Sequence, residues 1–156
     1  MMNIFVTLLM MLIIQPINAV REILSLNRHD EVISNPLIKG KKILLLGDSL
    51  AEGLSSTFYK LSRQCGYSPI AQYQRGTTID HWSQKFEKIV LENKPSLVII
   101  SLGTNDATLR DPEAQRKHIK NIKNIAIKYN VKIMWILPQA LPAKFSSQIS
   151  IKRLIV

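Results

Sequence analysis

The sequence is poor in cysteine and in acidic residues, and each shortage excludes a class of protein. Cys65 is the only cysteine among 156 residues, so the chain has no disulfide framework and no cysteine pair spaced for a structural metal. Asp and Glu number 11 against 21 Lys and Arg, which gives a formal net charge of +10 at pH 7. A basic surface attracts acidic partners, but there is no nucleic-acid-binding motif and no Arg-rich stretch. We therefore expect no nucleic-acid partner.

The glycine-rich patterns that bind nucleotides are also missing. The chain has neither GxGxxG after its first apolar run nor GxxxxGK[ST] anywhere, so nothing supports nucleotide binding. The length suits one domain with a sizeable core and is too short for two.

The N-terminal apolar run, residues 4–14, is too short for a membrane span, which needs roughly 20 residues. Pro16 breaks it, and Ala19 ends an imperfect small-residue cleavage site. We predict a signal peptide at residues 1–19, a leader at 20–40 and the folded domain at 41–156. The protein is then expected in the periplasm or outside the cell. The alternatives are an uncleaved membrane anchor and a buried core helix, because no Lys or Arg precedes the run.

Short apolar runs alternate with segments in which apolar residues recur at helical spacing. The runs predict strands at residues 41–46, 69–73, 97–102 and 131–137. The spacing predicts helices at residues 50–65 and 79–93, and Asp111-Pro112-Glu113 predicts the start of a third. Buried strands that alternate with amphipathic helices indicate an α/β domain with a parallel sheet.

Polar clusters follow the first three predicted strands. They are Gly47-Asp48-Ser49, Arg75-Gly76-Thr77 and Gly103-Thr104-Asn105-Asp106. Ligands of parallel sheets bind beyond the carboxyl ends of the strands, so we expect the three clusters to form an active site.

Ser49 lies in a strand-to-helix turn, where a hydroxyl can project from the sheet and helix amides point toward it. Acyl transfer needs donors for an oxyanion, and the backbone of Gly76 and the side chain of Asn105 offer them. Each residue also has a plainer interpretation: a helix-capping serine for Ser49, an ordinary turn for Gly76, and a turn with a helix cap for Asn105-Asp106. The coincidence of all three at successive strand ends favours catalysis.

The segment KILLLGDSL at residues 42–50 resembles the nucleophile block of the GDSL/SGNH hydrolase superfamily. Gly103-Thr104-Asn105-Asp106 resembles its GxND block, and Gly76 fits the isolated glycine between them. The resemblance covers about residues 41–138. It implies a three-layer α/β/α sandwich of the flavodoxin-like type, with a five-stranded parallel sheet often ordered 2-1-3-4-5. It further implies that Ser49 is the nucleophile and a backbone oxyanion donor, that Gly76 and Asn105 are the other donors, and that no metal or organic cofactor takes part.

The base that would activate Ser49 is missing from the pattern. The superfamily takes it from a DxxH block near the C-terminus, but residues 139–156 contain neither Asp nor His. Of His29, His81 and His118, none fits that block, and His81 is the nearest substitute. Residues 145–156 could open a helix or form a fifth strand before they stop on an apolar run. We therefore expect a domain cut short at its C-terminus.

These features predict an exported, monomeric serine ester hydrolase that acts on small-molecule or polymer-borne esters, such as an acetylated glycan or a lipid ester, and that is impaired by loss of the base. One alternative is a non-catalytic relative that binds an acylated glycan or lipid. Another is a basic peripheral protein of the membrane or cell envelope that presents the Lys-rich segment 117–132 to acidic polymers, although a solvated helix face is the simpler explanation of those lysines.

Overall fold

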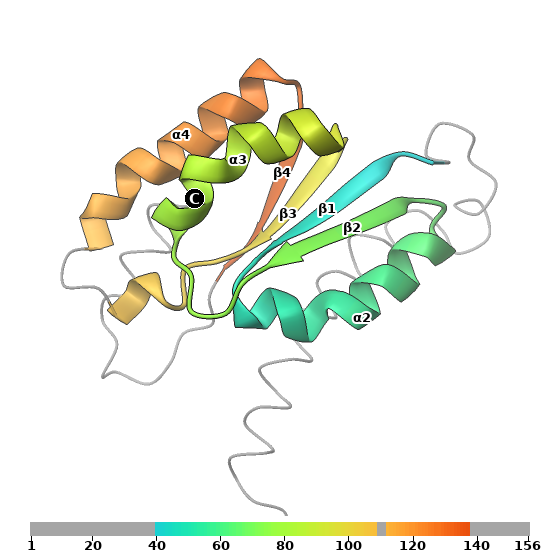
Figure 1. The fold of residues 1–156 in the computed structure, drawn as a ribbon, viewed down its shortest axis with the longest axis horizontal. Coiled ribbons are helices and arrows are strands. Elements are labelled where there is room, and N and C mark those ends of the chain that lie inside the picture. Colours follow the sequence, from blue (N-terminus) through green and yellow to red (C-terminus); the bar gives the residue numbers. More distant parts are fainter. Residues whose placement is uncertain (1–39, 109–111, 138–156) are drawn as a thin grey trace, which may run out of the picture.

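The strands form in the four apolar runs that the sequence indicates. The computed structural model describes residues 40–108 and 112–137. Within them lies one parallel sheet of order β2-β1-β3-β4 (Figure 1). Its strands are β1 (Lys42–Gly47), β2 (Ser68–Tyr73), β3 (Leu97–Ser101) and β4 (Lys132–Ile136). The predicted parallel α/β fold is confirmed, and the strand order agrees with the order 2-1-3-4 that the resemblance implied.

Helices cover both faces of the sheet. Helix α2 (Ser49–Gln64) lies on one face, whereas α3 (Ile79–Asn93) and α4 (Arg116–Lys128) lie side by side on the other (Figure 1). The arrangement is the predicted three-layer α/β/α sandwich. It follows from the order of the elements, since each helix connects two parallel strands and must cross over the sheet to do so.

The central strand β1 divides its side chains between two cores because successive residues of a strand point to opposite faces. Leu44 and Leu46 pack against α3 and α4, and Ile43 and Leu45 pack against α2. All four side chains are at most 1% exposed. The continuous apolar run thus reflects a strand covered on both sides.

The third crossover differs from the prediction. A 3-10 turn, η3 (Pro112–Gln115), comes first, and the α-helix begins only at Arg116. Tight turns of this kind are frequent at helix N-termini. The proposed cap, Asp111, lies outside the described residues. Cys65 is the half-buried C-cap residue that follows α2.

Several predictions fall outside the described residues: the signal segment at 1–19, the leader up to residue 39, and a fifth strand at 145–156. They remain predictions. In the part of the chain that the structure describes, no helix is both long and apolar enough to cross a membrane.

Candidate active site

Ser49 is the first residue of α2, and its side chain is exposed at the carboxyl end of β1. The residue that caps this helix is Asp48, whose Oδ1 accepts a hydrogen bond from the Leu50 backbone N–H at 2.8 Å. The interpretation of Ser49 as a capping serine is therefore wrong. Within residues 40–108 and 112–137 its hydroxyl has no hydrogen-bond partner, so it is available to an incoming molecule.

Gly47 brings this turn close to β3. A β-carbon at Gly47 would lie 2.2 Å from the carbonyl oxygen of Ser101 and 2.8 Å from the Ala51 side chain. The next residue donates a hydrogen bond to the same carbonyl, from Asp48 N to Ser101 O at 3.3 Å. Only glycine fits here without a shift of the backbone, so this position sets where Asp48 and Ser49 lie relative to β3.

Asn105 joins the three polar clusters. Its side-chain Nδ2 donates to Asp48 Oδ2 at 3.2 Å and to the Thr77 carbonyl oxygen at 2.9 Å. The first cluster supplies Asp48, the second supplies Thr77 and the third supplies Asn105. The structure therefore brings together the strand-end clusters that the sequence suggested, and the amide of Asn105 is the group through which they meet.

Hydrogen bonds of Thr77 stabilise the loop that carries Gly76. The Thr77 hydroxyl donates to the Gln74 carbonyl at 2.7 Å and accepts from the Trp82 indole N–H at 2.8 Å. Gly76 itself has a φ of +71°, in the left-handed region that favours glycine. A β-carbon there would have no atom within 4 Å, so the space beside this residue is open.

An ion pair between Arg75 and Glu52 stabilises the same loop on the protein surface. Arg75 contacts Glu52 through two of its nitrogens, with Nη2 3.2 Å from Glu52 Oε1. The hydrogen bond from Arg75 lowers the pKa of the Glu52 carboxyl, and the same pairing raises the pKa of Arg75. The pair links the second polar cluster to the first turn of α2, close behind Ser49.

Asp106 caps a helix far from its own position in the chain. Its buried carboxylate accepts from the Ile79 N–H at 3.0 Å, across 27 positions, and so caps α3. Burial raises its pKa to about 6; the hydrogen bond from Ile79 opposes this shift, and the charges of Asp80 and Asp48 add to it. Burial also raises the pKa of Asp48. The plainer interpretation of Asn105-Asp106, a turn with a helix cap, holds in part: a 3-10 turn begins at Asp106, but the helix that its carboxylate caps is the distant α3.

Asp48 and Thr77 are the residues whose importance the sequence analysis missed. Asp48 directly precedes a predicted helix, which is the position of a helix cap, so that role had a local signal. Thr77 had none, because its role depends on contacts with Asn105 and Trp82.

No histidine of residues 40–108 or 112–137 forms a hydrogen bond with Ser49. His81 lies in the first turn of α3, with its Nε2 2.9 Å from Lys85 Nζ and its ring edge-on to Trp82 at 5.4 Å. His29 lies outside the described residues. Over the described ranges there is also no group of three or more His, Cys, Asp or Glu side chains that would hold a metal ion.

Solved structures with this fold include an acetyl xylan esterase and a GDSL-like lipase. An acetyl xylan esterase, AlAXEase, superimposes with a TM-score of 0.64 at 19% identity, over 73% of this chain and 70% of that one. The protein TesA gives 0.64 at 22% identity, over 73% and 70%. A GDSL-like lipase from Bacteroides thetaiotaomicron VPI-5482 gives 0.58 at 23% identity, over 73% and 60%. At these identities the similarity establishes the fold alone.

The chain therefore has the GDSL/SGNH fold that its sequence blocks suggested. No curated protein sequence matches it. Residues 42–155 match the family described as "Protein of unknown function (DUF459)", and the match spans most of the chain, including every described strand and helix. The protein belongs to the DUF459 family.

Proposed function

We propose that this protein is a serine ester hydrolase with Ser49 as its nucleophile. The observation that carries the proposal is the setting of the Ser49 side chain. It is exposed at the start of α2, and Asp48 rather than Ser49 caps this helix. The Asn105 amide bonds to Asp48, which directly precedes Ser49, and to Thr77, which directly follows Gly76.

In the proposed reaction, Ser49 Oγ attacks the ester carbonyl carbon and gives its proton to a base. The carbonyl oxygen becomes an oxyanion, for which the backbone N–H groups of Ser49 and Gly76 and the Asn105 amide are the candidate donors. Collapse of the tetrahedral intermediate breaks the ester C–O bond, and the alcohol leaves with a proton. Water then attacks the acyl-enzyme, releases the carboxylic acid and restores Ser49.

The histidines in the described residues form no hydrogen bond with Ser49, so we expect slow turnover unless a base from another part of the chain completes the site. The proposed substrates are esters of small alcohols or of polymers, including acetylated glycans and lipid esters. We also propose that the protein lies outside the cytoplasm, either free or anchored to a membrane. This part of the proposal rests only on the predicted signal segment at residues 1–19.

Hydrolysis of p-nitrophenyl acetate by the full chain and by a Ser49→Ala variant tests the proposal. We expect the variant to lose the protein-dependent rate. Ser56→Ala is the matched control, because Ser56 is an exposed serine of the same helix. Equal rates for the wild type and Ser49→Ala would refute catalysis through Ser49.

A second candidate is a non-catalytic protein that binds an acylated glycan or lipid in the same place. It is favoured because no histidine of the described ranges forms a hydrogen bond with Ser49. A fluorophosphonate probe separates the two functions, since it labels only an activated serine. Labelling that disappears in Ser49→Ala supports the hydrolase, whereas an unlabelled protein that retains an ester ligand supports the binding protein.

A further inference from the structure

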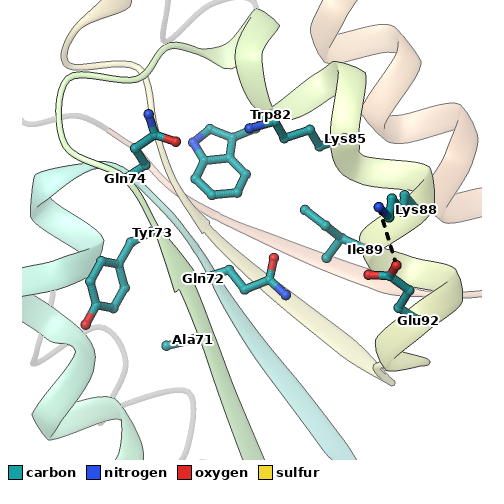
Figure 2. Close-up of a pocket in the computed structure, with 9 residues that line it drawn as sticks. All are labelled: Ala71, Gln72, Tyr73, Gln74, Trp82, Lys85, Lys88, Ile89 and Glu92. Carbon is teal, nitrogen blue, oxygen red and sulfur yellow. Dashed lines mark ion pairs between the residues drawn. The ribbon is translucent and has the colours of Figure 1, made fainter.

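A groove of about 540 Å³ runs between β2 and α3. Figure 2 shows its shape: β2 forms the floor and the facing turns of α3 form the wall. Because β2 is the edge strand next to β1 in the described sheet, no further described strand covers this side. The residues around the groove are Ala71, Gln72, Tyr73, Gln74, Trp82, Lys85, Lys88, Ile89 and Glu92.

Two glutamines provide the polar groups of the floor. Gln72 and Gln74 point toward α3, whereas Ala71 and Tyr73 point toward α2 (Figure 2). Gln72 lies in β2 and Gln74 directly follows the last residue of this strand, so the two residues are spaced by roughly 7 Å if the backbone stays extended. Neither side-chain amide forms a hydrogen bond with another residue of the described ranges. Each amide can therefore donate to and accept from a ligand.

The wall of the groove combines two apolar side chains, Trp82 and Ile89, with charged ones. The indole N–H of Trp82 is already bonded to the Thr77 hydroxyl at 2.8 Å, so its ring offers carbon atoms to the groove, as Ile89 does. The charged groups lie at the rim and have partners there. Lys85 Nζ is 2.9 Å from His81 Nε2, and Lys88 Nζ is 3.7 Å from Glu92 Oε1.

At one end of the groove, hydrogen bonds connect Gln74 to the residues of the candidate active site. The Gln74 N–H donates to the Gly47 carbonyl at 3.0 Å, and the Gln74 carbonyl accepts from the Thr77 hydroxyl at 2.7 Å. Gly47 precedes Asp48-Ser49, and Thr77 follows Gly76. A molecule that lies along β2 therefore ends beside the residues of the proposed oxyanion site.

We infer that this groove binds a polyhydroxylated chain, the glycan portion of an ester substrate, and directs its acylated end toward Ser49. The inference rests on the proposed function and identifies the alcohol component of the ester as a glycan. Hydroxyl groups both donate and accept, as the two glutamine amides do, and the C–H faces of sugar rings match an indole and an aliphatic wall. A lipid tail would instead bury both glutamine amides against hydrocarbon without hydrogen-bond partners, which is unfavourable.

The spacing of the polar groups also favours an extended chain over a small alcohol. Gln72 lies near the end of β2 and Gln74 just beyond it, and the lining continues along α3 from Trp82 to Glu92, roughly 15 Å of helix. A single sugar would contact one glutamine, whereas an oligosaccharide would contact both.

Binding is tested on the Ser49→Ala protein, in which catalysis is not required. We would titrate it with xylohexaose, cellohexaose and chitohexaose and follow backbone amide, side-chain amide and indole N–H signals by NMR. At least one hexasaccharide should shift the signals of Gln72, Gln74 and Trp82. Replacing both glutamines by alanine should weaken that binding at least tenfold. Gln84→Ala should leave it unchanged, because Gln84 is an exposed glutamine of α3 outside the groove.

Thermal unfolding of each variant verifies that it is folded before binding is compared. Binding that survives the double glutamine replacement, or no binding of any of the three hexasaccharides, would overturn the inference. So would shifts confined to the backbone of β2, which would indicate a peptide strand added to the sheet edge.

An activity measurement separates this inference from the proposed function. In a chain with Ser49 intact, the double replacement should lower the ratio of kcat/KM for acetylated xylan to that for p-nitrophenyl acetate at least fivefold, and Gln84→Ala should not change this ratio. If hexasaccharides bind through the glutamines but Ser49→Ala hydrolyses both esters as fast as the wild type, the groove stands and the hydrolase proposal fails. If hydrolysis depends on Ser49 but the ratio stays constant, only the groove inference fails.

Discussion

The side-chain amide of Asn105 donates a hydrogen bond to the Asp48 carboxylate over 3.2 Å, linking residues 57 positions apart. The same Nδ2 donates to the Thr77 carbonyl at 2.9 Å, so both of its hydrogens have acceptors in the unliganded protein. To stabilise an oxyanion, Asn105 must break one of these two hydrogen bonds. The contact with Asp48 is the longer of the two. We expect it to open when substrate binds, while the contact with Thr77 keeps the amide in place.

Asp48→Asn tests the structural side of this arrangement. The replacement keeps an oxygen for the Leu50 N–H but removes the acceptor for Asn105. We expect the free energy of unfolding to fall by about 1 to 2 kcal/mol, since a partly buried amide loses a charged acceptor. Urea denaturation followed by circular dichroism measures the change.

Asp48→Ala provides the comparison, because it also removes the helix cap and should cost about 1 kcal/mol more. If the Asn and Ala variants are equally unstable, the cap contributes nothing and Asp48 does not stabilise α2 through the Leu50 N–H.

Asn105→Ala tests the catalytic side. Loss of one oxyanion donor lowers kcat by roughly 10² to 10³ in serine hydrolases, and we expect a drop of that size with p-nitrophenyl acetate. Asn124→Ala is the matched control, since Asn124 is exposed on α4. An Asn105→Ala enzyme that keeps its kcat would exclude this residue from the oxyanion site.

A pair of glycines tests how tightly the turn before Ser49 is packed. At Gly47 a β-carbon would lie 2.2 Å from the Ser101 carbonyl oxygen, whereas at Gly53 it would have no atom within 4 Å. We expect Gly47→Ala to destabilise the protein by about 3 kcal/mol, because the backbone of β3 must move. Gly53→Ala should stabilise it by about 0.5 to 1 kcal/mol, since Gly53 lies inside α2. Thermal and urea unfolding of the two variants should give changes of opposite sign.

The sequence predicted the features that depend on local pattern. The continuous apolar run of β1 predicted a buried strand, and its neighbouring residues Ile43 and Leu44 do lie in cores on opposite faces of the sheet. The position of Ser49 after that strand predicted an exposed side chain at the sheet edge. Both predictions are confirmed. The roles assigned to Ser49, Gly76 and Asn105 in catalysis remain proposals.

The features that were missed depend on contacts between distant segments. Asp106 caps α3 across 27 positions, and nothing in its own neighbourhood indicates that the recipient is Ile79. The groove is similar, because Gln72 and Gln74 look like ordinary polar residues of an edge strand. They become a binding surface only when α3 places Trp82 opposite them. Local periodicity carries no information about either relationship.

Asp106 should make stability depend on pH in a direction that is unusual for a carboxylate. Its pKa is raised to about 6 in the folded protein from an ordinary value of 3.8, so the folded state holds this proton more tightly than the unfolded state. Between these two values the unfolded chain has lost the proton while the folded protein keeps it. The contribution of Asp106 to stability is therefore full below pH 3.8, falls as pH rises through the window and is lost above about 6, by on the order of 3 kcal/mol.

Asp106→Asn isolates this effect, because the amide oxygen still accepts from the Ile79 N–H but the side chain no longer titrates. We expect the variant to gain stability relative to the wild type as pH rises from about 4 to about 7, by on the order of 2 to 3 kcal/mol. Urea denaturation of both proteins across this range measures the difference, in which the other carboxyl groups largely cancel. The hydrogen bond from Thr78 lowers the pKa of Asp80, so this residue affects stability only below the pH range tested, and it is present in both proteins. A difference that does not vary with pH would mean that Asp106 is ionised throughout, and that its hydrogen bond to α3 outweighs its burial.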